Sequence, residues 1–390
     1  MRVILTVIAG PHKGQKFTFD RHDTFLVGRS KHAHFQLPAK DRNLSRIHFM
    51  MEVNPPECRL IDMGSHNGTF VNGESRLSAD LKDGDQIRAG HTVLRVHVLR
   101  EAPSTTDGPV PFWDVGAAPA IPGYVIEREL GRGAMGITYL VRREGHGTLY
   151  AAKVVRPSVA GSATQISEFL RSARMLLQLD HPHLISLREV GTCSGGFYLL
   201  SEFFPGLNAA QVLERDGPLP IARGVRWASQ LLEALHYGHG KHFIHCDIKP
   251  TNVIVAEIDG KEVAKLADYA TARVYQAAPF SGLSLTASLL SLASFMPPEL
   301  LFNYQEVNAV ADQYSVAAVL YHLLTGKPVL DVPREEKKRY SSLIRRQYVP
   351  LREHRREIPP ALAAAIEKAL ARTPGQRFAD AEAFRKALLV

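Results

Sequence analysis

Cysteine is scarce in this chain of 390 residues, which contains only Cys58, Cys193 and Cys246. An odd number of widely separated cysteines does not suggest a disulfide framework, and their spacing matches no metal site. The 17 histidines likewise form no His-Glu-x-x-His motif and no Cys/His cluster. We therefore expect neither structural disulfides nor a structural metal, and a reducing, cytoplasmic location fits this composition.

Long hydrophobic runs are also missing. A helix that crosses a bilayer needs about 20 apolar residues, whereas the apolar stretch from Val316 to Leu324 is far shorter. The first ten residues have the pattern of a strand followed by a turn, not that of a signal peptide. We find no internal repeat. The sequence thus predicts no membrane partner.

The sequence also lacks a concentrated cluster of charges of one sign. The net charge is +8 and the isoelectric point is about 9.3, which by themselves would suit a nucleic-acid partner. The basic residues are spread along the chain, however, and segments such as 352–357 mix both signs. We therefore expect no nucleic-acid partner, and interpret the excess as solvated basic faces that suit acidic ligands.

One dense group of polar residues stands out against these absences. The run His245-Cys-Asp-Ile-Lys-Pro-Thr-Asn252 contains Asp247, Lys249 and Asn252, and Asp268 follows a strand-like apolar stretch. Phosphoryl transfer needs such parts, because the protein must hold metal ions, neutralise charge and orient a hydroxyl. Asp247 would accept the substrate proton and Lys249 would face the transferred phosphate. Asn252 and Asp268 would bind Mg²⁺, or Mn²⁺, through hard oxygen ligands.

A glycine-rich turn lies upstream. An apolar strand from Tyr124 leads into Gly131, Gly133 and Gly136, and a second short strand ends in Lys153. Glycines let main-chain amides approach phosphates, and a lysine on the next strand can hold the α and β phosphates. Alone, the glycine pattern also fits an ordinary hairpin turn or a dinucleotide loop. A dinucleotide loop would open a helix, whereas residues 137–141 continue as a strand.

These motifs, in this order, resemble the protein kinase family over residues 123 to 390, in particular bacterial eukaryotic-like serine/threonine kinases. The resemblance implies an α+β bilobal fold that binds ATP. Residues 198–206 would form the hinge, with Ser201 as gatekeeper and main-chain groups of Glu202 to Phe204 facing adenine. In the large lobe, Asp312 would begin a buried helix and Arg377 would pair with Glu299. Lys249 is similar to the serine/threonine branch.

Five positions depart from the family pattern. Ser172 stands where a glutamate in the expected helix 168–179 would pair with Lys153; Glu168, one turn earlier, is either its substitute or a solvated first-turn residue. Cys246 replaces an arginine that grips a phosphorylated activation loop, which implies less dependence on such phosphorylation. The remaining departures are Ala270, Leu292 and Pro297, with Ser291 or Ser294 as candidates to replace the threonine expected at Leu292.

The departures leave two functions open. The retained residues would contact ATP, metal and substrate hydroxyl, whereas the changed ones mostly regulate or orient. We therefore expect an active serine/threonine protein kinase. The alternative is a pseudokinase, a phosphopeptide-binding scaffold with little or no phosphotransfer.

The first hundred residues show short alternating strands separated by Gly, Pro and Asn turns, which is typical of an all-β sandwich. Three segments, 28–30, 45–48 and 67–73, are expected between strands. In this order they resemble the forkhead-associated domain, which implies binding of phosphothreonine proteins. By that resemblance, Arg29, Ser45 and Arg46 hold the phosphate, although Arg46 also fits a solvated surface position. Asn67 and Asn72 would hold the peptide backbone.

The chain is thus expected to have two domains, with residues 1–100 forming the phosphothreonine-binding domain and 123–390 the kinase. Residues 101–122 are rich in Pro, Gly, Ala and Ser, and are interpreted as a flexible linker. Thr105 and Thr106 in this linker are either ordinary solvated residues or phosphorylation sites for self-association. Besides phosphothreonine proteins, the expected partners are protein substrates.

Overall fold

The computed structural model describes residues 2–20, 23–30, 33–37, 44–99, 119–133, 136–155, 171, 173–193, 196–268, 294–302, 307–330 and 348–389. Several predictions concern residues outside these ranges. They are those on Glu168, Ser172, Ala270, Ser291, Leu292, Thr105 and Thr106.

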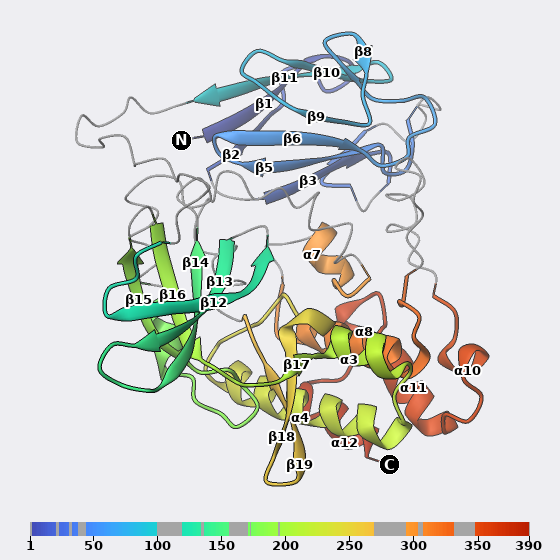
Figure 1. Cartoon of the computed structure of the whole chain (residues 1–390). Helices are drawn as coiled ribbons and strands as arrows, with labels where there is room; N and C mark the ends of the chain where they lie inside the picture. Colours follow the sequence, from blue (N-terminus) through green and yellow to red (C-terminus); the bar gives the residue numbers. More distant parts are fainter. Residues whose placement is uncertain are drawn as a thin grey trace.

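The N-terminal domain is a sandwich of two sheets (Figure 1). A six-stranded sheet has the order β2-β1-β11-β10-β7-β8, and a five-stranded sheet has the order β4-β3-β5-β6-β9. The strands are β1 (Arg2–Ala9), β2 (Lys16–Phe19), β3 (Asp23–Gly28), β4 (Phe35–Gln36), β5 (Phe49–Asn54), β6 (Glu57–Asp62), β7 (Phe70–Val71), β8 (Glu74–Ser75), β9 (Ser78–Asp80), β10 (Gln86–Ala89) and β11 (Thr92–Leu99).

Alternating apolar side chains build this sandwich. On β5, Phe49, Met51 and Val53 enter the core between the sheets, and Met50 points to the other face because successive side chains alternate. The all-β prediction is confirmed. One detail was wrong, because Phe70 and Val71 form β7 inside a segment expected between strands. They pair with only two residues of β10, and alternation over two residues leaves no pattern to detect.

The small lobe of the second domain is an antiparallel sheet of order β12-β13-β14-β16-β15. The predicted continuation of a strand after the glycine turn is confirmed by β13. Helix residues precede the 3-10 turn η1 (Leu176–Gln178), and the apolar residues Ala173 and Leu176 are buried there. The strands are β12 (Tyr124–Gly133), β13 (Gly136–Arg143), β14 (Leu149–Val155), β15 (Leu187–Cys193) and β16 (Gly196–Glu202).

The large lobe is mainly helical and contains a small sheet of order β17-β18-β19. Its described elements are β17 (Leu207–Asn208), α3 (Ala209–Asp216), α4 (Ile221–Gly240), η2 (Pro250–Asn252), β18 (Val253–Ile258), β19 (Lys261–Leu266), α7 (Pro298–Phe302), α8 (Val310–Thr325), α10 (Leu351–His354), α11 (Pro360–Ala369), η4 (Pro374–Gln376) and α12 (Ala381–Leu388).

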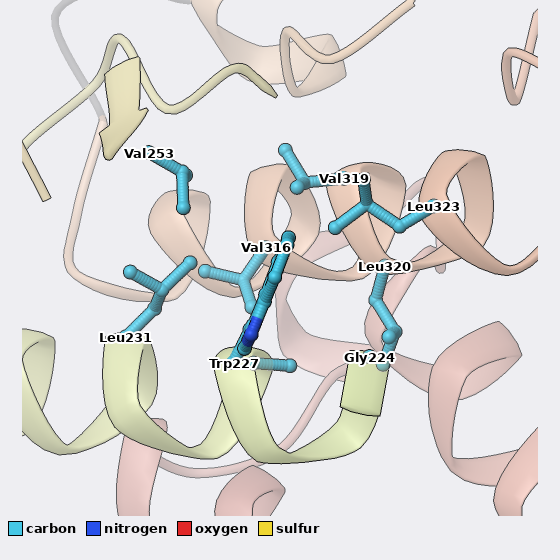
Figure 2. Close-up of a pocket in the computed structure, with 9 residues that line it drawn as sticks. Gly224, Trp227, Leu231, Val253, Val316, Val319, Leu320 and Leu323 are labelled. Carbon is cyan, nitrogen blue, oxygen red and sulfur yellow. The ribbon is translucent and has the colours of Figure 1, made fainter. Parts of the chain in front are cut away.

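Packing of α4 against α8 forms the centre of the large lobe. Figure 2 shows the Trp227 indole of α4 between side chains of α8 such as Val316 and Leu320. Its Nε1 donates to Glu262 at 2.7 Å, so the ring is buried without leaving its polar atom unsatisfied. The space between the helices is lined by apolar groups, and we interpret it as core packing rather than a ligand site. The predicted buried helix beginning near Asp312 is confirmed by α8.

An ion pair fixes α7 to the rest of the large lobe. Arg377 Nη1 and Nη2 donate to the two carboxylate oxygens of Glu299, at 2.5 Å and 2.8 Å. The pairing expected from the sequence is thus confirmed. In Figure 1, α7 lies beneath β3 of the sandwich. Among the described residues, no helix combines the length and apolar content that crossing a membrane requires.

Candidate functional site

The segment that begins at His245 brings three functional side chains together. Lys249 Nζ donates to both carboxylate oxygens of Asp247, at 3.0 Å and 2.8 Å. Asn252 Nδ2 donates to the main-chain carbonyl and to Oδ2 of Asp247, at 2.9 Å and 3.0 Å. Pro250 begins η2, whose turn returns Asn252 to Asp247. The Asp247 carboxylate is therefore held by an ammonium and an amide.

Asp312 holds the main chain of this segment. Its carboxylate accepts hydrogen bonds from the amides of His245 and Cys246, both at 2.8 Å, and from His239 Nε2 at 2.9 Å. Burial raises the pKa of Asp312, but these donors outweigh burial and hold that pKa below its ordinary value. From the sequence alone, Asp312 is expected only at the start of a helix. One feature of the sequence could have indicated this role: Asp312 lies close to the apolar run 316–320. A carboxylate that is buried with such a run must accept hydrogen bonds from nearby donors.

His245 connects the Asp247 segment to Asp268. Its Nδ1 accepts from the main-chain amide of Asp247 at 3.2 Å, and its Nε2 lies 3.0 Å from the carbonyl of Ala267. With Nδ1 accepting, Nε2 carries the proton and donates. Burial lowers the pKa of His245, which keeps the ring neutral. The neutral ring therefore fixes the spacing of the two loops.

Lys153 and Asp268 form an ion pair between the lobes. Lys153 on β14 donates to Oδ1 and Oδ2 of Asp268 at 2.9 Å and 2.8 Å. Desolvation raises the pKa of Asp268, but the charge and hydrogen bonds of Lys153 outweigh it and hold that pKa below its ordinary value. Asp268 also has a left-handed backbone with φ of 68°, a conformation that persists only where the surroundings impose it. The carboxylate is thus ionised and fixed.

The glycines of the predicted phosphate loop lie on β12 and β13. A side chain at Gly136 would place Cβ 1.9 Å from the carbonyl oxygen of Val154, on the strand that carries Lys153. A Cβ at Gly131 would meet nothing within 4 Å. Gly131 and Gly133 thus lie on β12, before the turn. Gly136 lies at the start of β13, after the turn, and permits the close approach of β13 to β14.

The hinge residues are held by a lysine that the sequence analysis missed. Lys265 on β19 donates to Glu202 Oε1 at 2.6 Å, and its ammonium lies 5.0 Å from the centre of the Phe204 ring. The Glu202 main-chain amide donates to the Ser186 carbonyl at 2.9 Å. Lys265 stands in an alternating strand pattern that is typical of a solvated lysine. The sequence therefore provided no indication that Lys265 contacts the hinge.

In the N-terminal domain, the end of β3 lies against the loop before β5. The amide of Arg29 donates to the Ser45 carbonyl at 3.2 Å, and the amide of Ser30 donates to the Arg46 carbonyl at 2.9 Å. A Cβ at Gly28 would lie 2.3 Å from that Arg46 oxygen, so only glycine permits this approach. The exposed residues Arg29 and Arg46 and the half-buried Ser45 therefore lie at one edge of the sandwich. The guanidinium group of Arg29 donates through Nε to the Leu44 carbonyl at 2.8 Å.

The segment around Asn67 joins the same edge. The Ser45 hydroxyl accepts from the amide of His66 at 3.0 Å. The imidazole of His48 accepts from the Ser45 amide and lies 3.1 Å from the carbonyl of Gly68. The structure thus brings Asn67 near the Arg29 and Ser45 loops, in a geometry with donors for a phosphate and an extended peptide.

Asn72 has other neighbours in this structure. Its Nδ2 donates to Asp85 at 2.8 Å, and its Oδ1 accepts from the amide of Gln86 at 2.9 Å. The side chain therefore supports the turn before β10. Of the five residues expected to bind a phosphopeptide, four lie in connected loops and Asn72 contacts this turn.

Two departures from the family pattern lie within the described residues. Cys246 contributes its main-chain amide to Asp312, and its backbone is left-handed with φ of 60°. Pro297 precedes α7, and its carbonyl accepts from Leu300. Ser294, a candidate to replace the missing threonine, donates its hydroxyl to the Leu330 carbonyl at 3.1 Å. None of these three side chains interrupts the contacts of Asp247, Lys249 and Asn252 described above.

Comparison with known proteins identifies the family. Residues 124–389 match the protein kinase domain, and residues 25–90 match the FHA domain. The chain therefore belongs to the protein kinase family and carries an FHA (forkhead-associated) domain ahead of its kinase domain. Both resemblances and the predicted two-part fold class are confirmed.

The relatives are bacterial serine/threonine kinases. Serine/threonine-protein kinase PknD of Mycobacterium tuberculosis is 31% identical over 258 residues, which cover 66% of this chain and 38% of PknD. The chain thus spans well under two thirds of that protein. The crystal structure of the Mycobacterium tuberculosis PknI kinase domain is 26% identical, has a TM-score of 0.54, and matches over 69% of this chain and 96% of that one.

A second solved structure matches both domains together. The structure of Rad53 in complex with AMP-PNP is 19% identical, has a TM-score of 0.56 and covers 100% of both chains. At this identity the likeness concerns the fold alone. It shows that one solved chain has this overall fold.

Membership of the kinase family implies ATP and a divalent metal, and the residues present fit both. Divalent cations such as Mg²⁺ prefer hard oxygen ligands. The Asp268 carboxylate is ionised, and the amide nitrogen of Asn252 faces Asp247, which leaves the amide oxygen as the donor for a metal. The Lys153 ammonium lies beside Asp268, as a group that neutralises phosphate charge should.

Proposed function

We propose that this chain is a cytoplasmic, ATP-dependent serine/threonine protein kinase with its own phosphothreonine-binding domain. The observation that supports this most is the arrangement of Lys249 and Asn252 around the Asp247 carboxylate. It joins a base, a cation and a metal-ligand amide in the way that phosphoryl transfer requires. The three cysteines form no disulfide, in keeping with a reducing compartment.

Each group has a separate task in this proposal. Asp247 accepts the proton of the substrate hydroxyl, and Lys249 stabilises charge on the transferred phosphate. Asn252 and Asp268 hold Mg²⁺ or Mn²⁺, which neutralises phosphate charge when bound. Lys153 positions the α and β phosphates. These charges act in a partly dehydrated site, where their effect is stronger than in water.

Nucleotide binding would use main-chain groups. We assign the main-chain groups of Glu202 and Phe204 to adenine, with Lys265 holding both hinge residues in place. Gly131, Gly133 and Gly136 would allow the strand turn to approach the phosphates.

The FHA domain would recruit phosphorylated proteins. We propose that Arg29, Ser45 and Arg46 hold the phosphothreonine phosphate, because charge-assisted hydrogen bonds to phosphate are strong. Asn67 would hold the peptide backbone, and Asn72 would do so by exchanging its contact with Asp85. Phosphorylation of Thr105 or Thr106 would create a ligand on the chain itself, for a second copy or for the same molecule.

The test of the kinase proposal is phosphate incorporation by the purified full chain. Wild type and Asp247→Asn would be compared with [γ-³²P]ATP, either metal and a mixture of protein substrates. Loss of the base should lower kcat by about 10²–10⁴. Asp259→Asn, the same change on the exposed β18–β19 turn, is the matched control and should leave kcat unchanged.

The outcome separates the two functions. Incorporation that Asp247→Asn removes and Asp259→Asn retains supports the kinase. A wild type that transfers no phosphate with Mg²⁺ or Mn²⁺ would instead indicate a phosphopeptide-binding scaffold with a kinase fold.

A further inference from the structure

One face of the FHA domain is apolar and buried, although it lies outside the domain's own core. Leu26 on β3, Met50 on β5 and Ile61 on β6 are 1%, 1% and 0% exposed. Their neighbours along the strands belong to the sandwich core, so these three point to the opposite side of the sheet. We call them, together with Met63, the docking face.

One hydrophobic cluster joins the docking face to the kinase domain. All four residues belong to the same continuous hydrophobic cluster as the core of the large lobe, and this cluster also includes small-lobe residues such as Phe197 and Leu199. Phe295 and Met296, just before α7, pack against this cluster, and β3 lies beside α7 (Figure 1). The FHA domain therefore rests on the segment 294–302.

That segment is fastened firmly to the large lobe. The Ser294 hydroxyl donates to the Leu330 carbonyl at 3.1 Å, and the ring centres of Phe295 and His322 are 5.6 Å apart. Further along, the buried carboxylate of Glu299 is paired with Arg377. Segment 294–302 thus offers a fixed platform on which a second domain can dock or release as a unit.

The docking face is connected to the phosphopeptide loop through the main chain. Ile47, which follows Arg46, packs against the same cluster as the docking face. The next residue, His48, donates its amide to the Val27 carbonyl at 2.8 Å. Val27 in turn follows Leu26 of the docking face. A ligand that moves Arg46 therefore acts on residues that also contact the large lobe.

We propose that the FHA domain is a releasable cover on segment 294–302, and that a phosphothreonine peptide bound at Arg29, Ser45 and Arg46 weakens this docking. The inference rests on the proposed function for the identity of the ligand. Arg46 and Ile47 are consecutive, so a peptide that shifts Arg46 also shifts a side chain that packs against the shared cluster. The coupling between docking and peptide binding is reciprocal. The factor by which the peptide weakens docking is therefore also the factor by which undocking strengthens peptide binding.

The test uses the full chain and two measurements that need no phosphate transfer. Ile61→Asp places a charge on the docking face and spares the sandwich core; Leu99→Asp, at a residue that is 52% exposed on β11, is the control. Hydrogen exchange would be followed at the amides of α7. Peptide affinity would be measured with a degenerate phosphothreonine library and its unphosphorylated counterpart.

We expect α7 to be protected in wild type and Leu99→Asp, and to exchange faster when the phosphorylated library is added. Ile61→Asp should exchange fast without ligand and bind the phosphorylated library at least about fivefold more tightly. Met50→Gln, a milder change, replaces Ile61→Asp if that variant does not fold.

Equal exchange and equal affinity in wild type and Ile61→Asp would overturn the proposal, as would α7 protection that the ligand leaves unchanged. If no protein binds the phosphorylated library, phosphopeptide recognition itself is wrong and the coupling fails with it. An inactive kinase, by contrast, would leave both measurements and the proposal intact.

Discussion

At the scale of single residues, two carboxylates in the large lobe have different tasks. Asp247 faces the proposed chemistry and is held by side chains. Asp312 is fully buried and binds the main chain of the Asp247 segment. A change of Asp247 should therefore affect activity alone. A change of Asp312 should also affect the stability of the loop on which activity depends.

Replacement of Asp312 should destabilise the protein. Asp312→Ala leaves two main-chain amides and His239 without their acceptor inside the core, and each buried donor left unsatisfied costs about 1–3 kcal/mol. Urea unfolding would measure the loss, with Glu214→Ala on the exposed side of α3 as the control. A loss below about 1 kcal/mol would contradict the role assigned to Asp312.

The same carboxylate should make stability depend on acid. The pKa of Asp312 is lowered in the folded state, so its contribution is complete above the unfolded value of about 3.9 and is lost as pH falls through the folded value. Between pH 6 and strong acid, Asp312→Asn should therefore lose less stability than wild type. Parallel acid dependences in the two proteins would refute this expectation.

At the scale of elements, the glycines of β12 and β13 differ in what they permit. Gly136→Ala forces Cβ against the Val154 carbonyl and should cost about 1–3 kcal/mol by overpacking, with displacement of Lys153. Gly131→Ala meets open space and is the matched control. Thermal melting should separate the two variants, and equal melting temperatures would show that the strands adjust.

A second element is the junction of β3 with the Ser45 loop. Gly28→Ala would place Cβ 2.3 Å from the Arg46 carbonyl oxygen, so the loop must shift and phosphopeptide affinity should fall by about tenfold or more. Gly147→Ala, whose Cβ meets nothing nearby, is the control. Titration with phosphothreonine peptides measures the effect, and unchanged affinity in Gly28→Ala would exclude the junction from recognition.

At the scale of the whole molecule, one hydrophobic cluster extends from the FHA sheet into the large lobe. Domains that share buried apolar area should unfold together. Calorimetry of the wild type should therefore show overlapping transitions, and Ile61→Asp should separate them by destabilising the docked arrangement. Two well-separated transitions in the wild type would mean that the shared cluster contributes little.

The sequence by itself determined the two domains and most of the candidate site. Strand alternation, the glycine turn and the spacing of Asp247, Lys249 and Asn252 are local properties, so they can be recognised without knowing the fold. Even the pairing of Glu299 with Arg377, far apart in the chain, followed from resemblance to a family.

Only the tertiary structure decided which distant groups meet. No local pattern specifies a partner far along the chain. Three contacts between elements are of this kind: Asp312 with the His245 amide, Lys265 with the hinge, and Lys153 with Asp268. The docking face is the clearest case. Met50 alternates with core residues as a solvent-facing side chain would, and its burial depends on a second domain whose position is fixed by packing rather than by periodicity.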